Sequence, residues 1–107
     1  MPTWTQVCRL DDLDVERGAA AIVGSGQVAV FRLHDGSVHA VGNLDPFSGA
    51  QVLARGIVGT RGGTDFVASP MHKQGFDLRT GRCLDDPDIA VPVYAVRVVE
   101  GVVEVSP

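Results

Sequence analysis

The chain has 107 residues, with nine basic and thirteen acidic side chains and a formal net charge of −4. Its basic residues form no run and include a single lysine, Lys73, so the chain lacks the concentrated positive charge that nucleic-acid binding requires. No apolar segment approaches the roughly 18 residues that span a bilayer, and the segment from Met1 to Thr5 has neither the charged start nor the apolar core of a secretory signal. We therefore expect a cytoplasmic protein that binds neither nucleic acid nor membrane.

The size and composition predict one domain, residues 1–107, with a β-sheet core. The length is close to the most common size of a single domain. Hydrophobic residues make up 45% of the chain but aromatic residues only 6%, so the core must consist mainly of valine, alanine, leucine and isoleucine. Thirteen glycines and six prolines supply frequent turns. β-Branched residues between regular turn signals are typical of many short strands.

Short strands separated by glycine-bearing turns are predicted along the first forty residues. The first strand is expected at 5–10, after which the acidic segment 11–18 turns away. Gly24-Ser25-Gly26 and His34-Asp35-Gly36 mark two hairpin turns, since Asp-Gly in particular tolerates the positive φ that tight hairpins need. The strands that flank these turns are expected at 20–23, 27–33 and 37–41.

Two irregular stretches, at 42–50 and 70–75, interrupt this pattern in the second half of the chain. Both contain turn residues without the alternation of a strand. Further on, Tyr94, Val96 and Val98 fall on one face of a predicted half-buried strand. No segment of ten or more residues carries a helical stripe, so we expect an all-β sandwich or barrel of short antiparallel strands. The strands of this half are expected at 57–60, 66–69, 76–78, 83–84, 93–99 and 102–105.

The two irregular stretches carry the most informative residues of the chain. The first contains Asp45-Pro46-Phe47-Ser48-Gly49-Ala50, and the second, with the residue before it, reads Ser69-Pro70-Met71-His72-Lys73-Gln74. Together they resemble the ligand boxes of Rieske domains, in which a Cys-x-His and a Cys-x-x-His motif hold a [2Fe–2S] cluster through two thiolates and two imidazoles. On this pattern the four ligand positions are occupied by Asp45, Phe47, Ser69 and His72. Only His72 could bind iron as the family does.

The side chains at the other three positions do not replace the missing ligands. Phenylalanine has no lone pair for a metal, and the hydroxyl of serine deprotonates far less readily than a thiol. An aspartate carboxylate is a hard oxygen donor that suits Mg, Ca or Mn. We therefore predict that this chain holds no iron–sulfur cluster, no other metal and no cofactor of its own.

Longer runs of sequence are similar to one family in particular. Residues 43–50, 55–59 and 68–74 resemble the small subunit of assimilatory NADH-dependent nitrite reductase, a Rieske-like family without a cluster. The resemblance implies an accessory, non-catalytic chain. It also implies a partner, the large subunit, which would carry FAD, siroheme and a [4Fe–4S] cluster and reduce nitrite to ammonia with electrons from NADH. No Gly-x-Gly-x-x-Gly fingerprint occurs here, which agrees with cofactors on the other polypeptide, and we assign no catalytic residue.

Two other functions are open on the sequence. A Rieske-type ferredoxin that transfers electrons to an oxygenase would share the fold, but three of its four ligands would be of the wrong type here. A free-standing module that binds another enzyme is the third option. The visible absorption spectrum of the isolated protein separates the ferredoxin from the other two.

We expect the tip formed by the two loops to be the partner interface, because the cluster-bearing tips of Rieske proteins face their redox partners. Phe47 could dock on the partner, or its ring could fill the space of a cluster. If the ring fills that space, Phe47→Ala should lower the free energy of unfolding by about 3–5 kcal/mol. His72 could contact the partner or donate a proton, but a hydrogen bond across the loops is the simpler role. The other residues assigned to this interface are Met71, Lys73 and Gln74.

The remaining polar and sulfur side chains have local roles in this interpretation. The Asp45 carboxylate is expected to accept amide hydrogens of its own loop in an Asx turn rather than bind metal. Cys8 and Cys83 form no Cys-x-x-Cys pair and are expected to be free, buried and reduced, although a bridge between neighbouring strands stays open. His34 and His39 flank a hairpin turn without a third ligand at metal spacing, so we expect them on the surface.

Overall fold

The chain folds into two antiparallel sheets joined by long loops. The structure is a computed structural model that describes residues 3–71 and 73–106. Within these residues the strands are β1 (Thr5–Arg9), β2 (Gly18–Val23), β3 (Gly26–Arg32), β4 (Val38–Gly42), β5 (Ile57–Arg61), β6 (Thr64–Ala68), β7 (Gly75–Asp77), β8 (Val93–Val99) and β9 (Val102–Ser106). Two single turns of 3₁₀ helix are η1 (Leu10–Asp12) and η2 (Leu53–Arg55). No helix in this part of the chain is long and apolar enough to cross a membrane.

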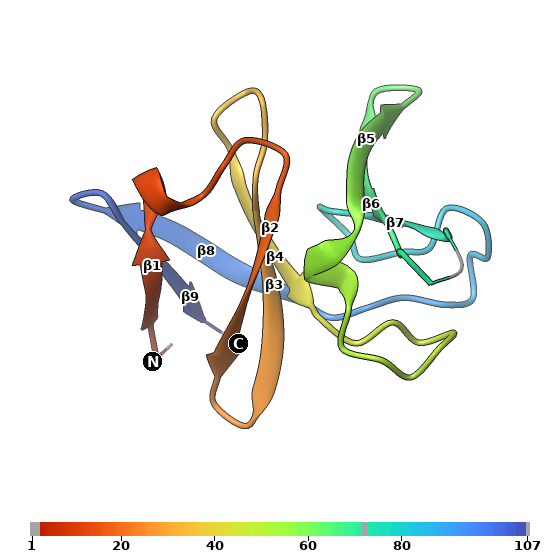
Figure 1. Cartoon of the computed structure of the whole chain (residues 1–107), viewed down its shortest axis with the longest axis horizontal. Helices are drawn as coiled ribbons and strands as arrows, with labels where there is room; N and C mark the ends of the chain where they lie inside the picture. The colour runs from red at the N-terminus through yellow and green to blue at the C-terminus, as the bar shows by residue number, and fades with distance from the viewer. Residues whose placement is uncertain (1–2, 72, 107) are drawn as a thin grey trace.

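Six strands form a curved sheet in the order β1-β9-β8-β4-β3-β2. Every neighbouring pair in this sheet is antiparallel. The edge strands β1 and β2 come into contact, so the sheet closes almost completely into a barrel (Figure 1). The hairpins β2–β3 and β3–β4 turn where the glycine-bearing segments predict them. The all-β prediction is therefore confirmed.

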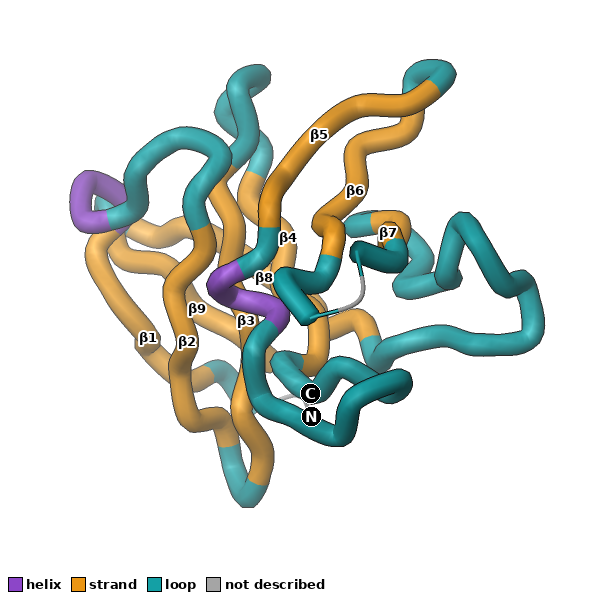
Figure 2. The backbone as a smooth tube through the Cα atoms, turned by 45° about the vertical axis from the view of Figure 1, so that its right-hand side comes forward, coloured by secondary structure: helices purple, strands orange, loops and turns teal. Residues whose placement is uncertain are grey.

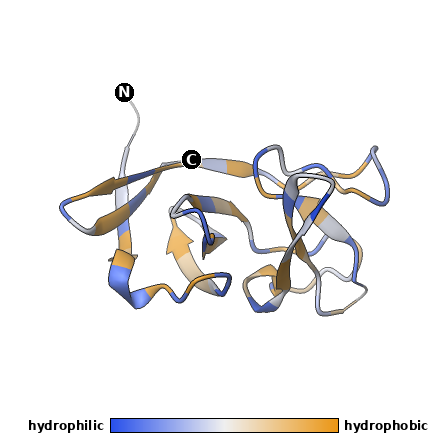
Figure 3. Ribbon diagram, turned by 90° about the horizontal axis from the view of Figure 1, so that it is seen from above, coloured by the Kyte–Doolittle hydropathy of each residue, from blue (hydrophilic) through white to orange (hydrophobic). Residues whose placement is uncertain are grey.

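The other three strands form a small sheet beside the barrel, in the order β5-β6-β7. Seen from above, the barrel and the small sheet lie side by side (Figure 3). The loop at 43–52 and then η2 connect β4 of the barrel to β5 (Figure 2). A second loop, at 69–74, follows β6 of the small sheet. The two irregular stretches of the sequence thus leave different sheets.

Two apolar clusters hold this arrangement together. One joins the barrel to the small sheet, since it contains Phe31 of β3, Leu53 of η2 and Phe76 of β7, all fully buried. The other lies within the barrel and contains Leu13, Val23, Val28, Val30, Ala40, Val103 and Val105. Because burial of a large apolar side chain stabilises a fold by about 1.5–3 kcal/mol, the first cluster fixes the position of the small sheet and of the loop after it.

Four details of the strand predictions are wrong. β2 begins at Gly18 and β6 at Thr64, each two residues earlier than expected. No strand forms at 83–84. There the chain makes an isolated antiparallel bridge between Phe76 and Cys83, in which the amide of Asp77 donates to the carbonyl of Arg82 and the amide of Leu84 donates to that of Gly75. The pairing extends no further. Val98 is 42% exposed although its alternation predicts a buried face, since it lies next to the turn of the β8–β9 hairpin, where it pairs with Val103.

The cysteines lie in different clusters and are both free thiols. Cys83 is buried between the two sheets, as expected. Cys8 is only partly buried and packs at the edge of the barrel cluster, so the expectation of full burial is wrong for this residue. Burial, followed by the negative charge of Asp12, raises the pKa of the Cys8 thiol above its ordinary value.

Candidate functional site

The two loops that carry the Rieske-like positions are joined directly by a side-chain hydrogen bond. The hydroxyl of Ser69 donates to Oδ2 of Asp45 over 2.6 Å. Both residues are buried, with exposures of 1% and 0%. The bond connects positions 24 residues apart, one after β4 of the barrel and one after β6 of the small sheet. A short bond to an ionised acceptor is among the stronger hydrogen bonds in proteins, so this contact fixes the loops relative to each other.

Asp45 also organises its own loop. Its Oδ1 accepts the amide hydrogen of Phe47 over 2.9 Å, which is the Asx turn that the sequence predicts. Oδ2 accepts the hydroxyl of Ser48 over 3.0 Å, and the backbone carbonyl of Asp45 accepts the amide hydrogen of Gly49. The buried carboxylate is therefore satisfied by donors from its own loop and from the facing loop.

The second loop is closed around Ser69 in the same way. The Ser69 hydroxyl oxygen accepts the amide hydrogen of Met71 over 3.2 Å. The Ser69 carbonyl accepts from the amide of Lys73, and the Ser69 amide donates to the carbonyl of Gln74. Lys73 takes a positive φ of 64°, which ends the turn. The backbone amides of Phe47 and Met71 are thus tied to one chain of hydrogen bonds through Asp45 and Ser69.

Opposing effects act on the pKa of the Asp45 carboxyl. Burial alone would raise this pKa, because it disfavours the charged form. The hydrogen bonds from Ser69 and from the Phe47 amide favour the charged form and outweigh burial. The pKa of Asp45 therefore lies below its ordinary value in the folded protein.

We expect the stability of the protein to fall in acid partly through Asp45. A carboxyl whose pKa is lower in the folded state adds stability above about pH 4, and this is lost as the pH falls through the folded pKa. Asn at this position does not titrate. The difference in unfolding free energy between the wild type and Asp45→Asn should therefore be largest near neutral pH and shrink below about pH 4. Urea unfolding at a series of pH values measures it, and a constant difference would contradict the assignment.

Apolar side chains are exposed on both loops. The ring of Phe47 lies over the buried ring of Phe76, with centroids 6.2 Å apart and planes tilted by 48°. Phe47 is nevertheless 37% exposed, so the ring both packs on Phe76 and faces solvent, and the docking and packing roles stay open. Met71 is 54% exposed. Leu44, at 45%, was missed from the sequence, because an isolated leucine in a loop carries no signal of exposure.

The other residues predicted at this tip differ in how far they reach solvent. Lys73 is exposed and Gln74 is half-buried. His72 lies outside the described residues. The exposed surface of the two loops, defined here by Leu44, Phe47, Met71 and Lys73, is called the tip surface below.

The donor set of these loops does not fit a [2Fe–2S] cluster. A Rieske cluster needs two thiolates and two imidazoles, whereas the first loop offers the carboxylate of Asp45 and the phenyl ring of Phe47. In the second loop, Ser69 stands where a Rieske domain has a cysteine thiolate, and its hydroxyl is already hydrogen-bonded to Asp45. Among residues 3–71 and 73–106, no group of three His, Cys, Asp or Glu side chains is arranged to hold a metal ion. The described side chains at these positions therefore make packing and hydrogen-bond contacts and do not match the donors of a Rieske cluster.

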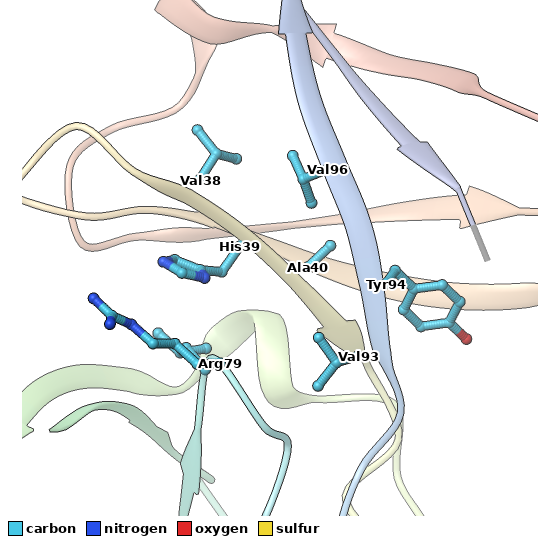
Figure 4. Close-up of a pocket in the computed structure, with 8 residues that line it drawn as sticks. Val38, His39, Ala40, Arg79, Val93, Tyr94 and Val96 are labelled. Carbon is cyan, nitrogen blue, oxygen red and sulfur yellow. The ribbon is translucent and has the colours of Figure 1, made fainter. Parts of the chain in front are cut away.

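A hollow of about 240 Å³ lies between β4, β8 and the turn after β7 (Figure 4). Its walls are polar and apolar in similar measure, and its titratable lining includes His39 and Arg79. His39 is half-buried, not on the surface as expected, and its Nε2 lies 3.0 Å from the Ser37 hydroxyl. Burial and then the charge of Arg79 lower the pKa of His39, so its neutral form is favoured. The hollow offers neither a set of metal ligands nor an activated nucleophile.

The comparisons with known proteins agree with this geometry. Residues 3–106 match the Rieske-like [2Fe-2S] domain family. The chain is 42% identical over 105 residues to the NADH nitrite reductase small subunit of Escherichia coli (strain K12), and the match covers 97% of each chain. It is similar, with a TM-score of 0.97 and 54% identity, to a crystal structure from Mycobacterium tuberculosis of a candidate NADH-dependent nitrite reductase small subunit. That match covers 100% of this chain and 96% of the other.

Two further similarities bear on partners and on the ferredoxin alternative. The nitrite reductase [NAD(P)H] large subunit of Klebsiella oxytoca is 42% identical to this chain over 103 residues, which are 96% of this chain and 11% of that protein. The ferredoxin subunit of anthranilate 1,2-dioxygenase from Burkholderia cepacia is 32% identical over 107 residues, 96% of this chain and 91% of that one. The similarity to the ferredoxin is thus lower than to the E. coli protein.

Proposed function

The chain belongs to the Rieske-like [2Fe-2S] domain family and, within it, to the NADH-dependent nitrite reductase small subunits, and we propose that it serves an assimilatory enzyme that reduces nitrite to ammonia. The observation that carries this proposal is the match to the E. coli small subunit along 97% of both chains. In this role residues 1–107 act as a single domain in the cytoplasm.

We infer that this subunit works without an iron–sulfur cluster of its own. Support comes from the contact between Asp45 and Ser69, which uses two of the four ligand positions for a hydrogen bond between the loops. A third position, Phe47, packs its ring on Phe76 instead of offering a donor atom. In this role the small subunit does not carry electrons itself.

The proposed partner is the nitrite reductase large subunit. In Klebsiella oxytoca a protein named as the large subunit itself contains a segment similar to this chain, which supports a role for the domain beside the reductase centres. FAD, siroheme and a [4Fe–4S] cluster would all be bound by the large subunit. The small subunit would then act through association.

We propose that this association uses the tip surface. Exposed apolar side chains on loops fixed by hydrogen bonds are suited to binding, because little conformational entropy is lost when they dock. Phe47 and Met71 provide exposed apolar area, and Lys73 provides a charged rim. His72 and Gln74 complete the interface predicted from the sequence.

The alternative, a ferredoxin for an oxygenase, has the fold similarity in its favour. A solved ferredoxin of carbazole 1,9a-dioxygenase from Nocardioides aromaticivorans has a TM-score of 0.86 and 30% identity to this chain, with 98% of each chain covered. Electron transfer needs a redox centre, however, and the loops here lack the donors for one. The small-subunit function is therefore the better supported of the two.

The test of the proposed function is nitrite-dependent oxidation of NADH by the purified large subunit, with and without this chain. We expect the mixture to oxidise NADH faster, or to keep its rate for longer, than the large subunit alone. An unrelated acidic protein of similar size serves as the control for non-specific protection. Equal rates and equal lifetimes in all three samples would contradict the proposed function.

Phe47→Ala separates packing from docking at the tip surface. Because the ring is partly exposed, we expect a loss of about 2 kcal/mol in unfolding free energy, below the 3–5 kcal/mol typical of a fully buried phenylalanine. We also expect binding to the large subunit to weaken at least tenfold, since a central aromatic residue often dominates an interface. Urea unfolding and calorimetric titration measure the two effects.

The matched control is Val99→Ala in β8. Val99 is 44% exposed, close to the value for Phe47, but it lies on the barrel away from the two loops. This variant should bind the large subunit like the wild type. Equal weakening by both substitutions would show that the tip surface has no special part in binding.

A further inference from the structure

A second surface feature lies next to the tip surface, between the start of β2 and the junction of η2 with β5. It is a hollow of about 330 Å³ lined by Arg17, Gly18, Ala54, Arg55 and Gly56. A Cβ atom on Gly18 would lie 2.3 Å from the carbonyl oxygen of Ala54, and one on Gly56 would lie 2.4 Å from that of Ala68. Backbone packs too closely at both glycines for any other residue. The side chains that line the hollow are therefore a methyl group and two long cationic chains.

The two arginines of this hollow have no anionic partner among the described residues. Arg17 and Arg55 are both exposed, and neither lies within 4.0 Å of a carboxylate in the part of the chain that the structure describes. Among the described residues only Arg61 and Arg97 pair with a carboxylate, so an unpaired arginine is common on this chain. Arg17 and Arg55 are set apart because they line the same hollow, and two guanidinium groups at one hollow favour an anion there.

The backbone around the hollow leaves recognition to the guanidinium groups. The amide of Arg55 already donates to the carbonyl of Val52, just before η2, and that of Gly56 donates to the carbonyl of Leu53 in η2. The amide of Arg17 donates to the carbonyl of Asp14, and that of Ala54 donates to the side chain of Asn43. A guanidinium presents parallel N–H groups that match the two oxygens of a carboxylate. The chemistry of the hollow therefore suits the side chain of a glutamate or an aspartate.

The residues that line the hollow contact the segments from which the two loops start. Asn43, at the start of the first loop, accepts the amide hydrogen of Ala54 on Oδ1 over 2.7 Å and that of Leu53 on its carbonyl over 3.1 Å. On the other side, Gly56 packs on Ala68, the residue before Ser69. The hollow thus borders both loops, and a partner that covers the tip surface is positioned to reach it.

We propose that the hollow between Arg17 and Arg55 binds an acidic side chain of the nitrite reductase large subunit. The proposal rests on the proposed function, because it extends the interface at the tip surface by an ionic contact. The two guanidinium groups, unpaired among the described residues, supply the complementary charge, and the adjoining tip surface supplies the apolar contact. Interfaces of this type combine an apolar centre with charged groups that set orientation and association rate.

The test is calorimetric titration of the large subunit with R17E/R55E. The matched control is R79E/R82E, which makes the same change in net charge at two exposed arginines beside β7. We expect R17E/R55E to raise the dissociation constant about 10- to 100-fold, as charge reversal at an interfacial ion pair does. The control should change it less than threefold, a margin set by long-range charge alone. The wild-type affinity should fall with added salt, and R17Q/R55Q should reduce that salt dependence.

Each outcome decides one claim. Equal affinities of the wild type and R17E/R55E, or equal weakening by R79E/R82E, would overturn the proposed contact and leave the proposed function standing. No binding by the wild type would overturn the proposed function and the contact with it. If R17E/R55E does not fold by circular dichroism, R17Q/R55Q replaces it, with an expected weakening of about tenfold. An unchanged affinity and salt dependence in R17Q/R55Q would also overturn the contact.

Discussion

Replacing Gly81 by alanine is expected to lower the free energy of unfolding by about 3 kcal/mol. Gly81 has a positive φ of 77°, and a Cβ there would lie 2.0 Å from the carbonyl oxygen of Val91 and 2.9 Å from the side chain of Val93. The Gly81 carbonyl also accepts the amide hydrogen of Val91, so the chain cannot move away without losing this bond. Domains of this size have a total stability of about 5–15 kcal/mol, so the loss would be large.

The control for this prediction is Gly36→Ala in the β3–β4 turn. Gly36 has a similar φ of 86°, but nothing lies within 4 Å of its would-be Cβ. The backbone conformation alone should then cost about 1 kcal/mol. Urea unfolding followed by circular dichroism measures both variants. Equal losses would show that the packing of residues 89–93 on the turn at Gly81 contributes nothing.

Asp45→Ala is expected to lower the free energy of unfolding by about 3–5 kcal/mol, because it leaves buried hydrogen-bond donors without an acceptor. The hydroxyl of Ser69 and the amide of Phe47 would both lose their partner, and Ser69 is too buried to replace it with water. Asp45→Asn keeps one acceptor oxygen and should cost only about 1–2 kcal/mol. The same unfolding experiment at neutral pH ranks the two variants.

A double-mutant cycle with Ser69→Ala isolates the bond between the loops. If Ser69 and Asp45 are coupled as their 2.6 Å contact indicates, the double variant should be less destabilised than the sum of the single variants by about 1.5–3 kcal/mol. Strictly additive losses would mean that the contact does not hold the loops together.

Local chemistry explains why most of the fold could be predicted. The Asp35-Gly36 turn needs a positive φ that glycine tolerates, and it forms the hairpin expected between β3 and β4. Two errors had non-local causes. The segment at 83–84 makes only one bridge, from Cys83 to Phe76, and the chain then turns so that the Cys83 amide also bonds to Ile89, which no local pattern indicates. Alternation assigns Val98 to a face of β8, but it does not tell whether that part of the face is covered.

The candidate site was predictable within each loop but not between loops. An aspartate before a proline indicates an Asx turn, and the Phe47 amide does donate to Asp45. That the other carboxylate oxygen accepts from Ser69 depends on how two sheets pack. Asn43, 2% exposed, was missed for the same reason, since its side chain bonds to η2 eleven residues later. The arginine hollow joins residues 38 positions apart, and no spacing in the sequence indicates it.

The central claim is that recognition by two hydrogen-bonded loops replaces redox chemistry in this subunit. The most direct test is to measure iron and acid-labile sulfide in the chain after anaerobic purification, together with its electron paramagnetic resonance spectrum in the reduced state. We expect background levels of iron and sulfide and no Rieske signal. Iron and sulfide in equal, stoichiometric amounts with a Rieske signal would contradict it.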